Sequence, residues 1–372
     1  MFITKESLNN LKYYKYSGVD HSLCANYILS PYFWEPLLAH CIPRSIAPNM
    51  ITLIGGLFMV LAYILFVTES PTGSETVSTF TLVMSGILIF LYQTADNLDG
   101  KQARRTSNSS PLGELFDHGV DTFMMGIFSM IIVIVFKFDL TTQLFIFVFL
   151  LTVFYMSHWE EYHTNTLVLG YIFNPTELQL LCVVGLFIIA INPNIIYLEI
   201  FGITIQYWAK YCIIGFASLA DIYYVYSAFS HINKTHCCTK IEALKHGFPY
   251  LCFSLLSFIN ILLLPNTFII SHYHLFIGTL ILINAYLTQR LIVHRICKEP
   301  VTYYHTLLIL YALYTLNGLF YSLQIPAFNF YFSLQLLFGF ALIFEIAFIY
   351  TIITSFSKHL HINVLFITPK HD

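Results

Sequence analysis

The chain has 372 residues, of which 57% are hydrophobic and only 10% are charged. Soluble globular domains carry about 25% charged residues, so a water-soluble enzyme, a disordered protein and a nucleic-acid binder of the basic-patch kind are excluded. The formal net charge of −3 gives no long-range field that would attract DNA. The 26 Tyr and 35 Phe suit a surface that faces lipid.

Ten apolar runs with soft edges are candidates to cross a bilayer, because a transmembrane helix needs about 17–25 residues. None of them has the period-2 alternation of a barrel strand. The runs are 50–67, 79–95, 118–136, 142–158, 178–193, 208–229, 249–265, 267–289, 304–324 and 331–355. We therefore predict an all-α, polytopic integral membrane protein with about ten transmembrane helices.

The basic residues support this number of spans. With ten spans and a cytosolic N-terminus, 15 of the 17 Lys and Arg residues fall on the cytosolic side, and only Lys137 and Lys210 fall on the opposite side. Cytosolic segments of membrane proteins are enriched in Lys and Arg. A span more or fewer would invert every later segment and remove this asymmetry.

The pattern divides the chain into three regions. Residues 1–48 are predicted to be a cytosolic N-terminal segment, in which the stretch from Asp20 to Asn49 is too broken by prolines and polar groups to span the membrane. We expect one or two helices that lie on the membrane surface there, with a polar loop as the alternative. Residues 49–230 are predicted to form the helices that carry the candidate catalytic residues described below, and residues 231–372 the C-terminal transmembrane helices.

Four of the eight aspartates fall within 26 residues, at the predicted cytosolic ends of the second and third spans. Asp96 and Asp99 are spaced i,i+3, and Asp117 and Asp121 are spaced i,i+4, so each pair lies on one helix face. A short polar stretch joins the two helices, which we expect to be antiparallel neighbours. The two acidic pairs would then face each other.

Carboxylates gathered at a membrane edge repel one another and need cations between them. Arg104 and Arg105 balance part of the charge. Hard oxygen ligands favour Mg²⁺ or Mn²⁺, and four carboxylates on two helices can hold two ions about 3.5–4 Å apart for phosphoryl transfer. A solvated charged loop without metal is the alternative, but such a loop would not need the paired spacing.

The residues between the acidic pairs suit a phosphate-containing ligand. Gly100 and Ala103 are small, so a bulky group can approach the helix backbone. Arg104 can clamp a phosphate through two hydrogen bonds. Gly113 opens the second helix, where Glu114 can reach a ligand group. These residues are predicted to form the substrate-binding part of the site.

This region resembles a known family. The run is Asp96-Asn97-Leu98-Asp99-Gly100-Lys101-Gln102-Ala103-Arg104, followed by Gly113, Asp117 and Asp121. It resembles the signature of the CDP-alcohol phosphotransferase family at every fixed position, and the flanking segments 15–20, 47–55 and 109–119 look like its eukaryotic choline/ethanolamine phosphotransferase branch. The resemblance is close over the first three spans and rests mainly on topology beyond them.

The resemblance implies that a phospho-alcohol is transferred from a CDP-alcohol to a lipid hydroxyl and that CMP is released. It implies two divalent ions, Mg²⁺ or Mn²⁺, held by the four aspartates of the acidic pairs. Arg104 and Asn49 should contact the pyrophosphate or the nucleotide, and Glu114 the CDP part of the substrate.

The lipid hydroxyl must lose a proton, and two residues are candidates for the catalytic base. His118 has an ordinary pKa near 6.5 that suits a base at neutral pH, and the eukaryotic branch carries a histidine at this place. Asp121 is the second candidate, as in relatives without this histidine. A third interpretation is that His118 only orients Asp117.

The head group is read from the end of the fourth span, His158-Trp159-Glu160-Glu161-Tyr162-His163-Thr164. This segment looks like that of ethanolamine-type members, although Asn165 stands where those have Gly. A primary ammonium favours carboxylates, whereas a trimethylammonium favours aromatic faces. We therefore predict transfer of phosphoethanolamine from CDP-ethanolamine to diacylglycerol. A cholinephosphotransferase or a dual-specificity enzyme is the alternative within the family, and a non-enzymatic transporter is the alternative outside it.

The expected partners are CDP-ethanolamine or CDP-choline, diacylglycerol, the lipid bilayer and a second copy of the chain in a homodimer. No nucleic-acid partner is expected. The expected location is the membrane of the endoplasmic reticulum or Golgi, with the active site facing the cytosol.

Overall fold

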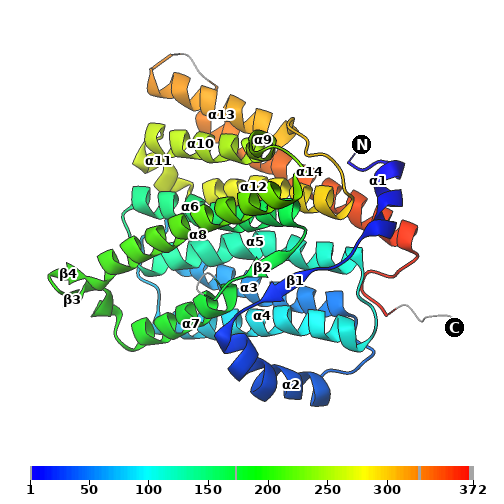
Figure 1. Cartoon of the computed structure of the whole chain (residues 1–372). Helices are drawn as coiled ribbons and strands as arrows, with labels where there is room; N and C mark the ends of the chain where they lie inside the picture. The colour runs from blue at the N-terminus through cyan, green and yellow to red at the C-terminus, as the bar shows by residue number, and fades with distance from the viewer. Residues whose placement is uncertain (1, 172–173, 326–327, 368–372) are drawn as a thin grey trace.

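The structure, a computed structural model, describes residues 2–171, 174–325 and 328–367. Almost all of it is helical, with long helices packed side by side (Figure 1). Residue 1 of the predicted N-terminal region, residues 172–173 of the predicted catalytic region, and residues 326–327 and 368–372 of the predicted C-terminal region lie outside the described residues.

Seven helices of the described chain are long and apolar enough to cross a membrane. They are α3 (Pro48–Glu69), α4 (Thr79–Arg105), α5 (Pro111–Val135), α6 (Leu140–Thr164), α8 (Ile205–Thr235), α12 (Tyr273–Ile296) and α14 (Phe330–Leu360). The pair α9 (Lys240–His246) and α10 (Phe248–Leu263), bent by 51°, makes an eighth candidate. The prediction of an all-α polytopic membrane protein is confirmed.

The predicted number of ten spans is not confirmed, because seven or at most eight helices in the described ranges are long and apolar enough to cross a membrane. Nine of the predicted spans each fall mainly on one helix, and the tenth, 267–289, covers both α11 (Asn266–Ser271) and most of α12. The two that fall short are α7 (Pro175–Ile191) and α13 (Thr306–Ser322), with 17 residues each. A helix of that length rises only about 26 Å at 1.5 Å per residue, less than the roughly 30 Å of a typical hydrocarbon core.

Short elements connect the long helices. Two small strand pairs are present in the described ranges: β1 (Gly18–Asp20) runs parallel to β2 (Leu167–Leu169), and β3 (Glu199–Ile200) antiparallel to β4 (Ile203–Thr204). The short helices are α1 (Lys5–Asn10), η1 (Leu11–Tyr13), η2 (Ala25–Trp34), α2 (Glu35–His40), η3 (Pro193–Tyr197) and α11 (Asn266–Ser271).

The turn between α4 and α5 is defined by local sequence. Backbone carbonyls at the end of α4 accept hydrogen bonds from N–H groups of the turn. The Asn108 N–H, for example, donates to the Ala103 carbonyl at 2.9 Å. Ser110 then caps α5, its hydroxyl accepting from the Gly113 N–H at 3.0 Å, and Pro111 occupies the first turn, where a missing N–H costs nothing. The two helices that carry the aspartates therefore leave and re-enter the bundle at the same end.

Helix α12 forms the centre of the bundle, because it packs against α5, α6, α10 and α14 and is the most buried of the seven long helices. Its contact with α5 is close: a Cβ added to Gly126 would lie 2.6 Å from Ile281. On the other side of α5, α3 packs on α4 at Gly55, where an added Cβ would lie 2.8 Å from that of Ala95. Small residues thus allow close packing of α12 on α5 and of α3 on α4.

The stretch expected on the membrane surface forms two consecutive helices, η2 and α2, rather than a polar loop. Their exposed apolar side chains include Tyr27, Ile28 and Tyr32. The end of α4 anchors them: the Lys101 ammonium donates to the Ser30 hydroxyl at 2.7 Å, and the Arg105 guanidinium donates to backbone carbonyls of α2 and the turn after it. This segment therefore lies beside the end of α4.

Candidate active site

Helices α4 and α5 bring three of the predicted metal ligands together. Asp96, Asp117 and Asp121 each offer a carboxylate oxygen, and these oxygens lie within 4.8 Å of one another. The fourth, Asp99, lies next to Asp117 across the helix pair, as Asp96 lies next to Asp121. The two acidic pairs therefore face each other, as the spacing predicted. We call these four residues the acidic cluster.

Two hydroxyl groups, one on α3 and one on α4, donate hydrogen bonds to the acidic cluster. The Thr52 hydroxyl on α3 donates to Asp99, and the Tyr92 hydroxyl on α4 donates to Asp121 at 2.6 Å. Asp117 Oδ1 is buried and has no hydrogen-bond partner among the described residues. An unpaired buried carboxylate oxygen is costly, so the cluster fits a divalent cation with oxygen ligands.

The predicted substrate-binding residues of α4 lie one turn beyond the acidic cluster. Arg104 is exposed, and within the described chain it forms no ion pair. A Cβ added to Gly100 would lie 3.5 Å from the Arg104 guanidinium, so the glycine leaves space beneath that group. Ala103 is partly exposed on the same helix. A free guanidinium beside partly exposed carboxylates suits a pyrophosphate with bound cations.

Asn49 and Gly113 lie close to each other, at the starts of α3 and α5. The Asn49 amide nitrogen donates to the Val364 carbonyl at 2.8 Å, and its oxygen would lie 3.7 Å from a Cβ added to Gly113. Asn49 is therefore held by the segment that follows α14, and its amide oxygen faces the first turn of α5.

His118 faces away from the acidic cluster, toward α6. Ligand atoms of His118, His158 and Glu161 lie within 4.8 Å of one another, and all three residues are buried. His158 Nδ1 lies 3.0 Å from Glu161 Oε2, and the His118 and His158 ring centroids are 5.1 Å apart. His118 Nδ1 is buried and has no partner within the described ranges. The two candidate bases thus have different surroundings, because Asp121 belongs to the acidic cluster.

Glu114 is already paired in this structure. It forms an ion pair with Arg295 at the end of α12, and it accepts a hydrogen bond from the Tyr14 hydroxyl. Arg295 Nη2 also lies 3.3 Å from Glu161 Oε1. Because the Arg295 guanidinium supplies positive charge there, the group of His118, His158 and Glu161 has less need of a metal than the acidic cluster.

Two tyrosines from the segment before β1 approach the site from outside the membrane-spanning helices. Burial raises the pKa of the Tyr16 hydroxyl, the negative charge of Asp117 raises it further, and Arg104 opposes the shift. Burial also raises the pKa of Tyr14, against the opposing charge of Arg295. Both phenols therefore remain neutral hydrogen-bond donors at physiological pH.

The two glutamates of the predicted head-group segment point in different directions. Glu160 accepts a hydrogen bond from Ser227 on α8, while Glu161 lies beside His158 and Arg295. Only Glu161 is therefore placed with His118.

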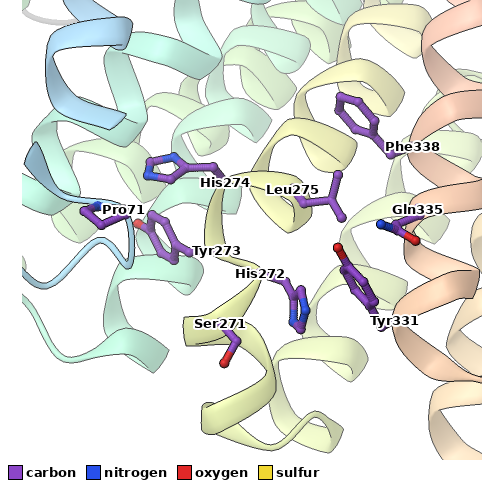
Figure 2. A pocket seen from close by; sticks show the side chains of 9 residues that line it. All are labelled: Pro71, Ser271, His272, Tyr273, His274, Leu275, Tyr331, Gln335 and Phe338. Atoms are coloured by element: carbon purple, nitrogen blue, oxygen red, sulfur yellow. The ribbon is translucent and has the colours of Figure 1, made fainter. Parts of the chain in front are cut away.

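A cavity of about 480 Å³ lies at the other end of the bundle and contains none of the predicted site residues. Figure 2 shows its lining, which comes from the end of α11, the start of α12, the first turns of α14 and the loop after α3. The lining residues are Pro71, Ser271, His272, Tyr273, His274, Leu275, Tyr331, Gln335 and Phe338. They include no carboxylate, so this cavity does not suit metal-dependent phosphoryl transfer.

Sequence reasoning missed four residues that contact the predicted site: Tyr14, Thr52, Tyr92 and Arg295. Tyr92 precedes Asp96 by four residues, so spacing alone could have predicted that it lies on the same helix face as Asp96. Arg295 gave a weaker signal, a basic residue near the end of an apolar run.

Comparison with known proteins agrees with this geometry. Residues 45–219 match the CDP-alcohol phosphatidyltransferase family. The chain is 31% identical over 369 residues to CDP-alcohol phosphatidyltransferase class-I family protein 2 of Dictyostelium discoideum, and the match covers 98% of this chain and 87% of that protein.

Two relatives have names that describe their activity. Choline/ethanolaminephosphotransferase 1 of Arabidopsis thaliana is 33% identical over 318 residues, which is 80% of each chain. Ethanolaminephosphotransferase 1 of Homo sapiens is 37% identical over 179 residues, 45% of each chain. The chain therefore belongs to the CDP-alcohol phosphatidyltransferase class-I family, a family of transferases that make phospholipids.

Proposed function

We propose that this protein transfers phosphoethanolamine from CDP-ethanolamine to diacylglycerol and releases CMP. The acidic cluster is the observation that supports this most, because a pyrophosphate needs concentrated positive charge and the cluster is suited to hold divalent cations. The family membership supports a CDP-alcohol as the donor.

The four aspartates would hold two Mg²⁺ or Mn²⁺ ions in this proposal. When bound, such ions neutralise pyrophosphate oxygens and the charge that develops on the departing CMP. The exposed Arg104 binds the pyrophosphate over the space left by Gly100 and Ala103. Asn49, whose amide oxygen faces the first turn of α5, and Glu114 orient the CDP part.

His118 is the proposed base. The diacylglycerol oxygen bonds to the phosphorus of the phosphoethanolamine group, the bond from that phosphorus to the CMP oxygen breaks, and the hydroxyl proton passes to a nitrogen of His118. The support is that His118 Nδ1 has no hydrogen-bond partner in the described part of the chain. Asp121 is the alternative base, but its carboxylate belongs to the acidic cluster and accepts from Tyr92, which leaves it less free to take a proton.

Glu161 supports ethanolamine over choline. A carboxylate beside His118 can accept N–H hydrogen bonds from a primary ammonium, and a trimethylammonium has no such donors. Two relatives whose names include both head groups favour dual specificity as the second candidate, namely the Arabidopsis thaliana protein described above and choline/ethanolaminephosphotransferase 1 of Saccharomyces cerevisiae, which is 39% identical over 194 residues.

We further propose a homodimer in the membrane of the endoplasmic reticulum or Golgi, with the acidic cluster facing the cytosol. The support for the orientation is the concentration of Lys and Arg at the end of the bundle that carries the cluster.

One experiment tests the function and its alternatives. Purified protein in lipid with diacylglycerol and Mg²⁺ is supplied with CDP-ethanolamine or CDP-choline, and both CMP and the lipid product are measured. We expect phosphatidylethanolamine with CDP-ethanolamine and a lower rate with CDP-choline. Equal rates would establish dual specificity, and faster use of CDP-choline would overturn the head-group assignment. Absence of CMP release with both donors would contradict the enzymatic function and favour a transporter.

A further inference from the structure

Arg295 joins two carboxylates that belong to different helices of the site. Its guanidinium forms ion pairs with Glu114 on α5 and, at 3.3 Å, with Glu161 on α6. The residue lies in the last turn of α12 and is only 9% exposed. Both contacts run from the same nitrogen, Nη2, so this one corner of the buried guanidinium lies between the two carboxylates.

Each of the two carboxylates lies beside a functional group of the proposed site. Glu114 precedes Asp117 by three residues and so shares its helix face. Glu161 contacts His158 at 3.0 Å, and the His158 ring lies 5.1 Å from that of His118. Arg295 therefore touches the carboxylate next to the acidic cluster and the carboxylate next to the proposed base.

Tyr14 completes the arrangement from the N-terminal side. Its hydroxyl donates to Glu114, and the segment that carries it is fixed to the end of α12, where the Asn10 amide donates to the Cys297 carbonyl at 3.1 Å. The Glu114 carboxylate is thus held by one residue that precedes the family region 45–219 and by another that follows it.

We propose that Arg295 is a positioning residue that holds Glu114 and Glu161 in the orientation in which they meet the CDP-alcohol. The C-terminal half of the chain would then contribute directly to substrate binding through α12, beyond its packing role. This inference rests on the proposed function, because it takes the CDP-alcohol as the ligand that Glu114 contacts.

A purely structural role makes a different prediction. If Arg295 only neutralises two buried carboxylates, its loss destabilises the protein, and removing the charge of Glu161 as well restores both stability and CMP affinity. If Arg295 positions the carboxylates, removing the charge of Glu161 as well restores stability but not CMP affinity.

The test compares Arg295→Lys with Arg290→Lys. Arg290 is a matched control on the same helix: it is also partly buried, it pairs with Glu299 at 3.7 Å and donates to the Phe2 carbonyl, and its ion-pair partners in the described chain include no carboxylate of α5 or α6. Lysine keeps the charge but loses the planar fork. We expect Arg295→Lys to raise both KM for CDP-ethanolamine and the dissociation constant of CMP, measured by calorimetry without diacylglycerol, by about 10–100-fold. KM for diacylglycerol and the values for Arg290→Lys should change less than about threefold.

Two further variants keep the proposal falsifiable if Arg295→Lys folds poorly. Tyr14→Phe removes one hydrogen bond to Glu114 without changing any charge, and it should raise the CMP dissociation constant while thermal stability in detergent stays near that of the wild type. The double variant Arg295→Met with Glu161→Gln should regain stability but not CMP affinity. Full recovery of CMP affinity in the double variant would overturn the positioning role. Equal CMP affinities of the Arg295→Lys and Arg290→Lys variants would overturn it as well.

The outcome for the proposed function is separate. A wild-type protein that neither binds CMP nor uses a CDP-alcohol would contradict the function itself. A wild-type protein that does both, with normal CMP affinity in the Arg295 and Tyr14 variants, would contradict only the role of Arg295.

Discussion

The Tyr92 hydroxyl on α4 donates a 2.6 Å hydrogen bond to the Asp121 carboxylate on α5. This bond ties the two acidic helices together at the acidic cluster. It also holds the Asp121 carboxylate in place. Because the Tyr92 hydroxyl carries no charge, it does not neutralise Asp121, whose negative charge remains available to a cation. Partners of this kind orient metal ligands and commonly change metal affinity when they are lost.

We predict that Tyr92→Phe weakens metal binding without removing it. The ring stays in place and one hydrogen bond to a carboxylate is lost, so the Mg²⁺ concentration for half-maximal CMP release should rise by about 10–100-fold. Saturating Mg²⁺ should restore most of the turnover. The measurement is the rate of CMP release as a function of Mg²⁺ concentration.

Tyr63→Phe is the matched control for this prediction. Tyr63 lies on α3, and its hydroxyl contacts His274 at 3.4 Å, in the part of the bundle away from the acidic cluster. Its loss should leave the Mg²⁺ dependence unchanged. A Tyr92→Phe enzyme with the Mg²⁺ dependence of the wild type would show that the bond to Asp121 does not orient a metal ligand.

Replacing an acidic-cluster aspartate should abolish activity. Asp96→Asn and Asp117→Asn each keep the size of the side chain but remove one negative charge from the group that would hold two cations. We expect both variants to insert into the membrane and to release no measurable CMP at ordinary Mg²⁺ concentration.

Asp139→Asn provides the comparison. Asp139 caps the start of α6 by accepting from the Thr142 N–H at 3.0 Å, and asparagine caps helices equally well. This variant should keep both its stability and its turnover. Near-normal turnover in Asp96→Asn or Asp117→Asn would refute the two-metal interpretation.

Local spacing was sufficient to predict which aspartates share a helix face. The i,i+3 and i,i+4 pairs, the Ser110 cap and Pro111 together define a helical hairpin, so that Asp96 and Asp121 meet across it. All ten helical runs could also be found from apolar length. Their exact ends could not: α13 has 17 residues where the apolar run 304–324 has 21, so this helix is shorter than one that spans a typical bilayer without strain.

Contacts between distant segments were not predictable from the sequence. Arg295 reaches Glu114 because α12 packs against α5 and α6 in the centre of the bundle, and no local pattern encodes that arrangement. Tyr14 reaches the same carboxylate from a segment with no apolar periodicity of its own. Such pairings depend on helix packing, which a periodic pattern restricts but does not determine.

The topology can be tested from contacts at the two ends of the bundle. Asn10 bonds to the end of α12, and Asn49 at the start of α3 bonds to Val364 after α14, so the segments before α3 and after α14 lie at the end of the bundle that carries the acidic cluster. The ammonium groups of Lys137 and Lys210 bond instead to hydroxyl groups at the other end. We expect both termini and the turn 106–110 to face the cytosol.

Acceptor sites for N-glycosylation measure this orientation. A tag at either terminus should remain unglycosylated, whereas an acceptor inserted in the loop 70–78, at the other end of the bundle, should be glycosylated. Glycosylation of a terminal tag would contradict the proposed orientation.

The proposed base gives the most specific kinetic prediction. The His118 ring faces α6, where it lies beside His158, while the neighbouring Asp117 belongs to the acidic cluster. His118→Ala therefore removes the imidazole without removing a carboxylate of the cluster. We expect turnover to fall by about 10²–10⁴-fold, the usual scale for loss of a general base. The affinities for Mg²⁺ and CMP should remain within a few-fold of the wild type.

His272→Ala is the control for this variant, because His272 packs on Tyr331 at the other end of the bundle, with ring centroids 4.2 Å apart. Its turnover should be close to that of the wild type. Single-turnover measurements then separate two roles for His118. A base is required for the chemical step, so the single-turnover rate of His118→Ala should fall with the steady-state rate. If that rate is kept while Mg²⁺ or CMP affinity is lost, His118 only orients Asp117, and Asp121 becomes the better candidate for the base.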